Sequence, residues 1–357
     1  MGANTGGRAF IGSFTSAGGL GITVADVDGN TGELSVLAST DVLADPSFLA
    51  VGRLPDTGAL VLYAVSEVSE GAAAAFDISG RGAPVLIGEP QPVRGDGPTH
   101  LDVRAGHLFT ANYGSGSVSA LPLRSDGSPG PAACVLRHEG AGPDIARQEA
   151  PHAHQVLADP SGNWVLSVDL GTDSVRVCAL DPGAGSLRTH SEAMLRPGTG
   201  PRHLVFHPSG GHLYVLNELE PTLTVCRWDA ATGLLEPLGE TSVLPRSTDD
   251  DGEAVRTYPS EVVVSHDGRF LWTAGRGHDS ISVLALDETA EKPVLVAAVG
   301  CGGRWPRDLT LDPTGQWLYA ANERSGNVSW FSLDAETGMP SPAGSVDVPA
   351  ATCVVFA

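Results

Sequence analysis

One stretch of the chain decides its fold: Gly200-Pro201-Arg202-His203-Leu204-Val205-Phe206-His207-Pro208-Ser209-Gly210-Gly211-His212-Leu213-Tyr214-Val215-Leu216-Asn217-Glu218. Two short apolar runs, residues 204–206 and 213–216, flank the turn-forming sequence at residues 208–210. The pattern predicts an antiparallel hairpin. The start of the first strand then lies beside the end of the second. We therefore expect Arg202 and Glu218 at the same end of the sheet.

The hairpin recurs along the chain. Further copies begin near residues 45, 97, 151, 258 and 305, so that six copies are present. A Gly/Ser-rich turn and a third strand follow each copy, and several third strands end in Asp-x-x-Thr-Gly, as at residues 28–32, 229–233 and 334–338. A weaker fourth strand precedes the next copy. Four short strands per unit of about 40–60 residues are typical of a β-propeller blade.

The two ends of the chain supply a seventh copy. Residues 349–356 resemble a first strand with no successor, and residues 9–13 resemble a second strand with no predecessor. Paired in one blade, they close the ring and remove its open sheet edges. We expect an all-β, seven-bladed propeller with four antiparallel strands per blade, formed as a single domain by residues 1–357. The nearest alternative is six blades, which leaves the ends unpaired.

The amino-acid composition limits the kinds of molecule that the protein is expected to bind. The net charge is −21, the hydrophobic content is 41% and the mean hydropathy is +0.02. This charge argues against nucleic acid and anionic membranes as partners. An anionic small molecule stays possible, because a few local arginines can dominate one cleft. We expect a monomer or a weak dimer.

Cysteine usage and the N-terminus bear on location. The five cysteines are odd in number and include no C-x-x-C pair, which disfavours a disulfide framework or a zinc site. The N-terminus lacks a basic segment followed by an apolar one, and no apolar run approaches the length of a membrane span. These features predict a cytoplasmic protein.

Two segments stand outside the repeat. Residues 144–149 are expected to form a turn of helix or a loop. The polar, acidic insertion at residues 246–256 is interpreted as a solvated loop or, alternatively, a lid over a site.

Aligning the hairpins gives two equivalent positions that face the propeller axis at one end. If these positions were purely structural, they should carry similar residues in every blade. Instead, histidine, arginine and glutamate side chains cluster on successive blades, which predicts one site placed off the axis. The first-strand positions are Ser47, Thr99, His154, Arg202, Ser260, Arg307 and Ala350. The second-strand positions are Phe14, Glu67, Tyr113, Leu170, Glu218, Arg276 and Glu323.

Structural interpretations compete with this site. Arg202 with Glu218, and Arg307 with Glu323, are suited to ion pairs within a hairpin. Arg276 has no acid opposite it in its own hairpin, and Glu261 at the entry to that hairpin is the alternative partner.

Other chemistries have weaker support. His152 and His154 form an H-x-H pair that can ligate zinc, but the surrounding arginines would repel a cation, and we expect no metal. A G-x-S-x-G elbow is absent, and the Gly-rich segment 111–117 precedes a strand rather than a helix, which excludes a P-loop.

Together these motifs resemble the seven-bladed-propeller lactonases over essentially the whole chain. The resemblance is carried by residues 97–101, 111–118, 150–155, 200–204, 216–219, 258–261 and 275–280. The family includes the bacterial propeller-type 6-phosphogluconolactonase and a fungal carboxy-cis,cis-muconate cyclase. A His, two Arg and a Glu are proposed as the cyclase site, and by motif they match His154, Arg202, Arg276 and Glu218. Gly275 stands where family members commonly carry Asn, which leaves the substrate open.

The resemblance implies hydrolysis of 6-phospho-D-glucono-1,5-lactone in the pentose phosphate pathway, without a cofactor or a metal. His154 or Glu218 would activate water, and Arg202 and Arg276 would bind the oxyanion or a substrate phosphate. The pocket would be lined by His100, Tyr113, His152 and Arg307. Three alternatives stay open: a cofactor-free lactonising cycloisomerase, a non-catalytic binding propeller and a metal-dependent lactonase.

Overall fold

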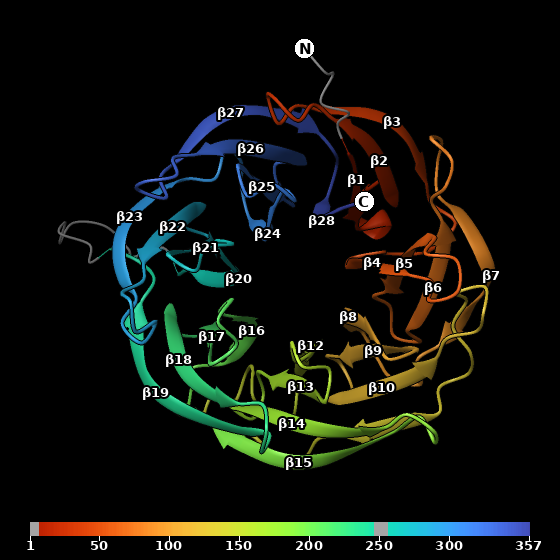
Figure 1. The fold of residues 1–357 in the computed structure, drawn as a ribbon, viewed down its shortest axis with the longest axis horizontal. Coiled ribbons are helices and arrows are strands. Elements are labelled where there is room, and N and C mark those ends of the chain that lie inside the picture. The colour runs from red at the N-terminus through yellow and green to blue at the C-terminus, as the bar shows by residue number, and fades with distance from the viewer. Residues whose placement is uncertain (1–6, 246–255) are drawn as a thin grey trace.

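A computed structural model describes residues 7–245 and 256–357, which form seven four-stranded antiparallel sheets arranged around one axis (Figure 1). The seven-bladed propeller predicted from the sequence is confirmed, and the six-bladed alternative is wrong. Blade 1 combines the two ends of the chain in the order β28 (Ala351–Phe356), β1 (Arg8–Ser13), β2 (Ile22–Val27) and β3 (Leu34–Thr40). The backbone nitrogen of Ala357 donates to the carbonyl oxygen of Arg8 at 2.9 Å, which continues this pairing.

The other six blades each use four consecutive strands, with the first strand nearest the axis (Figure 1). Blade 2 contains β4 (Leu49–Arg53), β5 (Leu60–Ser66), β6 (Ala72–Asp77) and β7 (Val85–Pro92). Blade 3 contains β8 (Pro98–Arg104), β9 (His107–Asn112), β10 (Ser117–Pro122) and β11 (Cys134–Arg137). Blade 4 contains β12 (Ala153–Ala158), β13 (Trp164–Asp169), β14 (Ser174–Asp181) and β15 (Ser186–Met194).

The remaining three blades complete the ring. Blade 5 contains β16 (Pro201–Phe206), β17 (His212–Asn217), β18 (Thr222–Asp229) and β19 (Leu234–Ser242). Blade 6 contains β20 (Tyr258–Val264), β21 (Phe270–Arg276), β22 (Ser280–Ala285) and β23 (Val294–Gly300). Blade 7 contains β24 (Pro306–Leu311), β25 (Trp317–Asn322), β26 (Asn327–Leu333) and β27 (Pro340–Asp347).

Helical structure is almost absent from the described residues, where the single 3-10 helix η1 (Thr15–Ala17) is the only helical element. Residues 144–149 form a turn, closed by a hydrogen bond from the Gln148 nitrogen to the Asp144 oxygen at 2.6 Å. This bond spans four residues, as in one turn of helix, but it is not continued, so the segment is a single turn within a loop. The expected loop or lid at 246–256 falls, apart from Arg256, outside the described residues.

The hydrophobic core lies between adjacent blades. One cluster joins Leu166 and Val177 of blade 4 to Leu213 and Val215 of blade 5, all fully buried. Apolar side chains on both faces of the inner strands are thus buried by a neighbour on each side, and this burial is the main stabilising contribution to the ring.

The Asp-x-x-Thr-Gly turns also join blades. Gly233 of blade 5 has a φ of +66°, and a Cβ there would lie 2.7 Å from the Trp164 ring of blade 4. Gly32 of blade 1 is placed in the same way against Trp317 of blade 7. Glycine is required in these turns both for the left-handed backbone and for the close approach of the neighbouring aromatic ring.

A register shift at the start of the first strand aims side chains toward the axis. In blade 5, Pro201 pairs with Asn217 and His203 with Leu216, so Arg202 is the extra residue of a β-bulge. Such bulges redirect a side chain out of the regular ladder. The same shift makes an extra residue of Thr99, His154, Arg307 and, in blade 1, Thr352. The repeat alignment, which assigned Ala350 to this position, was therefore wrong by two residues.

Candidate active site

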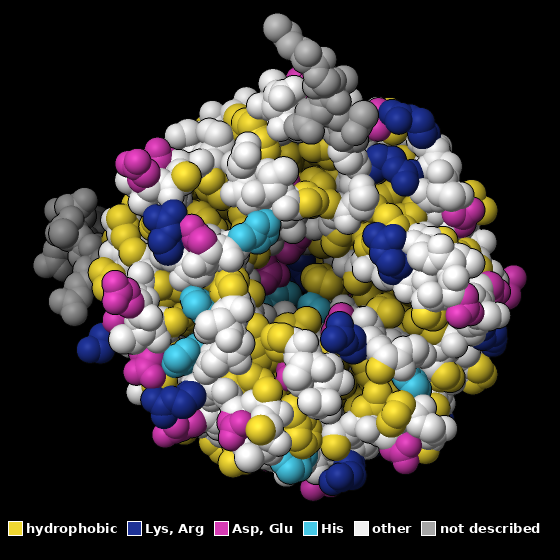
Figure 2. All heavy atoms as spheres, viewed as in Figure 1, with side chains coloured by type: hydrophobic (Ala, Val, Ile, Leu, Met, Phe, Trp, Pro, Cys, Tyr) yellow, Lys and Arg dark blue, Asp and Glu magenta, His cyan; other side chains and the backbone are white. Residues whose placement is uncertain are grey.

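A cavity of about 190 Å³ is lined by residues from every blade except blade 1: Glu67, Thr99, Tyr113, Arg147, His154, Glu218, Arg276 and Arg307. The space-filling view is hollowed at the axis, where histidine, acidic and basic side chains are visible (Figure 2). The cavity therefore reaches across the axis, which makes the site wider than the off-centre cluster that the repeat predicted.

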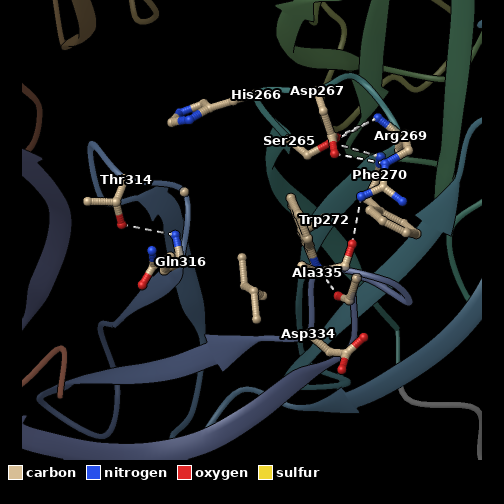
Figure 3. Close-up of a pocket in the computed structure, with 13 residues that line it drawn as sticks. Ser265, His266, Asp267, Arg269, Phe270, Trp272, Thr314, Gln316, Asp334 and Ala335 are labelled. Atoms are coloured by element: carbon tan, nitrogen blue, oxygen red, sulfur yellow. Dashed lines mark hydrogen bonds and ion pairs between the residues drawn. The ribbon is translucent and has the colours of Figure 1, made fainter. Parts of the chain in front are cut away.

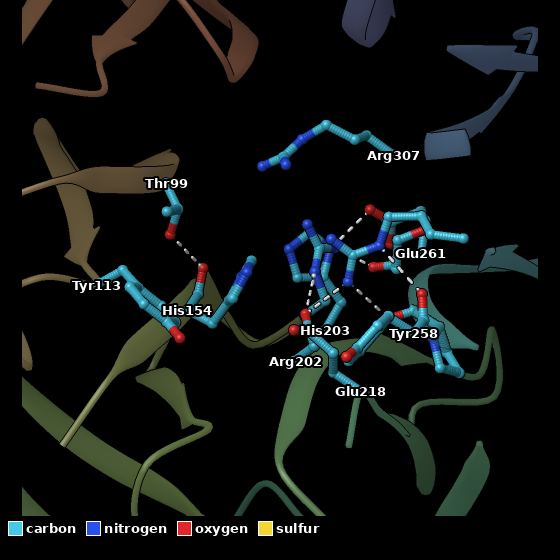
Figure 4. A network of polar contacts seen from close by, with 12 residues as sticks. Thr99, Tyr113, His154, Arg202, His203, Glu218, Tyr258, Glu261 and Arg307 are labelled. Atoms are coloured by element: carbon cyan, nitrogen blue, oxygen red, sulfur yellow. Dashed lines mark hydrogen bonds and ion pairs between the residues drawn. The ribbon is translucent and has the colours of Figure 1, made fainter. Parts of the chain in front are cut away.

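Glu218 is held by three guanidinium groups. Its Oε1 accepts a hydrogen bond from Arg147 Nη2 at 2.6 Å, and its Oε2 accepts one from Arg276 Nη2 at 2.7 Å. Arg202 Nε lies 3.2 Å from the same Oε2, which confirms the ion pair expected within this hairpin (Figure 4). Both carboxylate oxygens are occupied, so Glu218 organises the cations around it.

This arrangement shifts the pKa values of Glu218 and Arg202. Burial opposes ionisation of Glu218, but Arg276, Arg202 and Arg147 outweigh it and lower the pKa of this carboxyl to about 2. Burial and the neighbouring Arg276 lower the pKa of Arg202 to about 9. A carboxylate with so low a pKa is a poor proton acceptor.

Arg202 and Arg276 are fixed through backbone carbonyl groups. Arg276 Nε donates to the Tyr258 oxygen at 3.0 Å, and Arg202 Nη1 donates to the Ser260 oxygen. Arg276 lines the cavity, whereas Arg202 is 3% exposed and does not. The acid that pairs with Arg276 is Glu218 of the adjacent blade, and the pairing with Glu261 considered from the sequence is wrong.

The sequence did not predict Arg147 as a residue of the site. Besides Glu218, its Nη2 contacts the Tyr113 hydroxyl at 3.3 Å, and its side chain is 31% exposed. It lies in the turn at 144–149, which has no counterpart in other blades and so gave no signal in a repeat alignment. The basic character of Arg147 within a short polar insertion was the only clue.

His154 is buried against the cavity, in surroundings that favour its uncharged form. Its Nδ1 is buried without a hydrogen-bond partner in the described part of the chain. Burial, with the nearby Arg202, His203 and Arg276, holds the pKa of His154 well below its usual value. The lowered pKa favours the neutral imidazole at physiological pH, and no other described group occupies Nδ1.

Tyr113 and His152 form the wall beside His154 (Figure 4 shows Tyr113 next to His154). The Tyr113 and His152 rings stack with centroids 4.5 Å apart, and the Tyr113 and His154 rings meet edge to face at 5.6 Å. His152 Nδ1 lies 3.0 Å from the Tyr113 backbone oxygen. Tyr113 lines the cavity, whereas His152 supports Tyr113 from outside it.

Beneath the cavity lies a buried polar layer. His203 Nδ1 lies 2.6 Å from Glu261 Oε2, and the His203 ring contacts those of His100 and His154 at 5.2 and 5.1 Å. Burial raises the pKa of Glu261 to about 7, and burial together with Glu261 raises that of Asp308. His100, expected to line the pocket, instead packs in this layer and does not line the cavity.

Arg307 completes the cationic lining. Its Nη1 lies 3.2 Å from Glu323 Oε2, which confirms the second ion pair expected within a hairpin. In Figure 4, Arg307 stands apart from the Arg202–Glu218 network, and no dashed contact joins it to them. The cavity is thus lined by guanidinium groups that come from different parts of the ring.

Gly275 occupies a position that is structural in other blades. The equivalent Asn217 donates from its amide to Thr222 and Thr224, and Asn112 donates to Ser117 and Ser119. These amides link the second and third strands of a blade and do not line the cavity. The loss of an amide at Gly275 therefore removes an internal link of blade 6.

A second cavity of about 190 Å³ lies at the opposite end of the strands, between blades 6 and 7 (Figure 3). Its polar groups bond to one another: Arg269 Nε donates to Asp267 Oδ2 at 2.8 Å, and Trp272 Nε1 donates to the Gly338 oxygen at 2.8 Å. With these groups satisfied by the fold, we place the candidate site in the axial cavity.

The described residues contain neither a metal-binding cluster nor a membrane-spanning helix. Across residues 7–245 and 256–357, no three His, Cys, Asp or Glu side chains come together in an arrangement suited to a metal ion. The same residues contain no helix of the length and apolarity needed to cross a membrane.

Comparisons with known proteins agree with the fold. A family model described as "Lactonase, 7-bladed beta-propeller" matches residues 8–356. The chain is 32% identical over 354 residues to a 6-phosphogluconolactonase of Bacillus subtilis, with 97% of each chain covered. It is 29% identical over 340 residues to a 6-phosphogluconolactonase of Formosa agariphila, covering 92% of this chain and 93% of the relative.

Solved structures give the same result. A putative 6-phosphogluconolactonase from Bacteroides fragilis superposes with a TM-score of 0.90 at 26% identity, covering 100% of this chain and 99% of that one. A periplasmic gluconolactonase from Pseudomonas aeruginosa superposes with a TM-score of 0.86 at 27% identity, covering 98% of each chain. Relatives of this fold thus include a protein placed outside the cytoplasm, and the cytoplasmic location stays a prediction.

Proposed function

Because the chain belongs to the seven-bladed β-propeller lactonase family, we propose that it hydrolyses an anionic sugar lactone, with 6-phospho-D-glucono-1,5-lactone as the leading substrate. The observation that carries the proposal is the axial cavity, in which Arg147, Arg276 and Arg307 face the open space around a neutral histidine. Guanidinium groups bind phosphate and carboxylate oxygens through paired, charge-assisted hydrogen bonds. The cavity therefore suits an anionic substrate, although the chain as a whole is strongly acidic.

His154 is the proposed base. Hydrolysis requires a water molecule to lose a proton as it attacks the lactone carbonyl, and His154 is the neutral acceptor in the cavity. Glu218, the alternative, has both oxygens engaged by arginines, whereas Nδ1 of His154 has no hydrogen-bond partner among the described residues. We assign Glu218 to positioning Arg147 and Arg276, and we assign Arg202, behind it, to positioning Glu218.

Arg276 is the proposed oxyanion-binding group. Attack of water turns the carbonyl into a tetrahedral centre with a negative oxygen, which preorganised donors stabilise. Arg276 is held by Glu218 and by the Tyr258 carbonyl, so its orientation is fixed before the substrate binds. Arg147 and Arg307 then remain for the substrate phosphate. None of these steps uses a metal ion.

The test is turnover of 6-phosphogluconolactone by the purified protein, followed through oxidation of the released 6-phosphogluconate by an NADP-dependent dehydrogenase. We expect a rate well above spontaneous hydrolysis, and a loss of about 10²-fold or more in kcat for His154→Gln. The matched control is His207→Gln, at the outer turn of blade 5, which should keep wild-type activity. A wild-type rate equal to the spontaneous rate, together with turnover of an unsaturated dicarboxylic acid, would favour the cycloisomerase alternative.

A further inference from the structure

Glu67 is a second carboxyl group in the axial cavity, and its surroundings differ from those of Glu218. It follows β5 of blade 2 and lines the cavity together with His154 and Arg276. In Figure 1, β5 lies across the axis from β17, which directly precedes Glu218, and from β21, which ends at Arg276. Glu67 and Glu218 therefore follow strands on opposite sides of the ring, and both line the axial cavity.

The Glu67 carboxyl is not tied to a cation. Its Oε2 is buried without a hydrogen-bond partner, and it forms no ion pair, within residues 7–245 and 256–357. Glu218, in contrast, pairs with three arginines. An unpartnered, buried carboxyl oxygen is costly unless it serves a ligand or carries a proton.

Four groups face Glu67 from the surrounding elements. Burial raises the pKa of this carboxyl, and Asp45 raises it further, while Arg307, the Ser47 hydroxyl and Arg202 act in the opposite direction. Burial prevails, so the protonated form of Glu67 is more populated than that of an ordinary glutamate. Arg307 is the largest influence that lowers the pKa of Glu67. An anionic substrate bound to Arg307 would weaken this influence and so raise the population of protonated Glu67 further.

Lactone hydrolysis needs a proton donor as well as a base. When the tetrahedral intermediate collapses, the ring oxygen leaves as an alkoxide, which is a poor leaving group unless it is protonated. We propose that Glu67 is the general acid that donates this proton to the ring oxygen, an inference that rests on the proposed lactone hydrolysis. Carboxyl groups in unlike environments commonly divide roles in this way, with one kept ionised and the other protonated.

The proton and electron balance is complete. The oxygen of water bonds to the carbonyl carbon, its proton passes to His154, and the carbonyl electron pair moves to the oxyanion near Arg276. The pair returns as the bond between the carbonyl carbon and the ring oxygen breaks, and the Glu67 proton goes to that oxygen. The acid product ionises, and the proton held by His154 returns to Glu67 through solvent, so that one proton is released per turnover.

The kinetic test compares Glu67→Gln with a matched control, Glu70→Gln, an exposed glutamate in the same loop between β5 and β6. We expect Glu67→Gln to lower kcat by about 10²-fold or more while KM changes by less than about threefold. The fall in kcat at alkaline pH should disappear in this variant, and Glu67→Asp should recover part of the activity. A purely structural role for Glu67 would not produce this pH signature. A kcat within about threefold of wild type, or a raised KM with unchanged kcat, would overturn the inference.

Infrared difference spectroscopy gives a readout that needs no turnover. The spectrum of the wild type minus that of Glu67→Gln should contain the carbonyl stretch of a protonated carboxyl group that titrates above the ordinary glutamate range. The bands of Glu261 and Asp308 cancel in the difference. If the band is lost on raising the pH through or below the range in which an ordinary glutamate titrates, the assignment of Glu67 as the acid is refuted. Wild-type activity with no effect of Glu67→Gln removes this inference alone, whereas absence of wild-type activity removes the proposed function as well.

Discussion

Glu218 Oε2 lies 2.7 Å from Arg276 Nη2 across the boundary between blades 5 and 6, and the same oxygen lies 3.2 Å from Arg202 Nε within blade 5. One carboxylate thereby fixes arginines of two blades relative to each other. The orientation of Arg276 in the cavity depends on this contact, so a change at Glu218 should affect the site although Glu218 is not the proposed base.

Replacing Glu218 with Gln should reduce both activity and stability. The variant keeps the size of the side chain but leaves three guanidinium groups without their counter-charge. Removing one partner of a buried ion pair costs about 3–5 kcal/mol, and we expect kcat/KM to fall about 10²-fold. Denaturant unfolding and steady-state kinetics check the two effects. A variant with lost activity and full stability would show that Glu218 acts on the substrate directly.

The ion cluster also predicts a pH dependence of stability. The pKa of Glu218 is about 2 in the folded state and 4.5 in its unperturbed state. A depressed pKa contributes stability above pH 4.5, and this contribution is lost as the pH falls toward 2, with a size on the order of 3 kcal/mol. The difference in unfolding free energy between wild type and Glu218→Gln should therefore shrink over this window. A constant difference would contradict the ionised state assigned to Glu218.

Arg276→Lys should not conserve function. Lysine keeps the charge, but a single ammonium group cannot reach the Glu218 carboxylate and the Tyr258 carbonyl with the geometry of a guanidinium. We expect kcat to fall about 10–100-fold, with KM less affected because the proposed role lies in the transition state. Arg269→Lys, on the outer turn of the same blade, is the matched control. Equal activity of Arg276→Lys and wild type would exclude a fork-shaped contact.

Arg147→Ala should change the substrate preference. This side chain is more exposed than the other cationic groups of the Glu218 cluster and reaches the cavity from a loop. If it binds the phosphate, KM for 6-phosphogluconolactone should rise about tenfold, which corresponds to roughly 1.4 kcal/mol. KM for the unphosphorylated gluconolactone should stay unchanged. Equal effects on both lactones would instead assign Arg147 to the support of Glu218.

Activity should survive dialysis against a chelator. The cavity is lined by Arg147, Arg276 and Arg307, whose charge disfavours a divalent cation. We expect the rate after treatment with EDTA, measured in metal-free buffer, to match the untreated rate. Loss of activity that zinc or calcium restores would support the metal-dependent alternative.

The fold could be predicted from the sequence because the repeat is local. Each hairpin contains its own apolar runs, turn and charged end, so the pairing of Arg202 with Glu218 and of Arg307 with Glu323 followed from antiparallel geometry alone. The partner of Arg276 did not follow, because it comes from another blade, and the width of the ring at the axis is not encoded in any single hairpin.

The remaining residues of the site could not be identified by comparing equivalent positions of the repeated hairpins. Arg147 lies in an insertion that has no counterpart in the other blades, so no alignment of hairpins brings it to the cavity. Glu67 occupies the same repeat position as Glu218, and only the absence of a paired arginine distinguishes them. That difference depends on contacts between blades, with Arg147 and Arg276 lying 71 and 58 positions from Glu218 in the sequence.

At the bulges of the first strands, the side chain varies between blades while the strand pairing stays the same. Thr99, His154, Arg202 and Arg307 differ in size and charge, yet the strands around them pair in the same pattern. A side chain that leaves the ladder at this point can be exchanged with little effect on the hydrogen bonds that hold the blade together. Substitutions at these bulge positions can therefore change which substrate the cavity accepts while the strand pairing of each blade is retained.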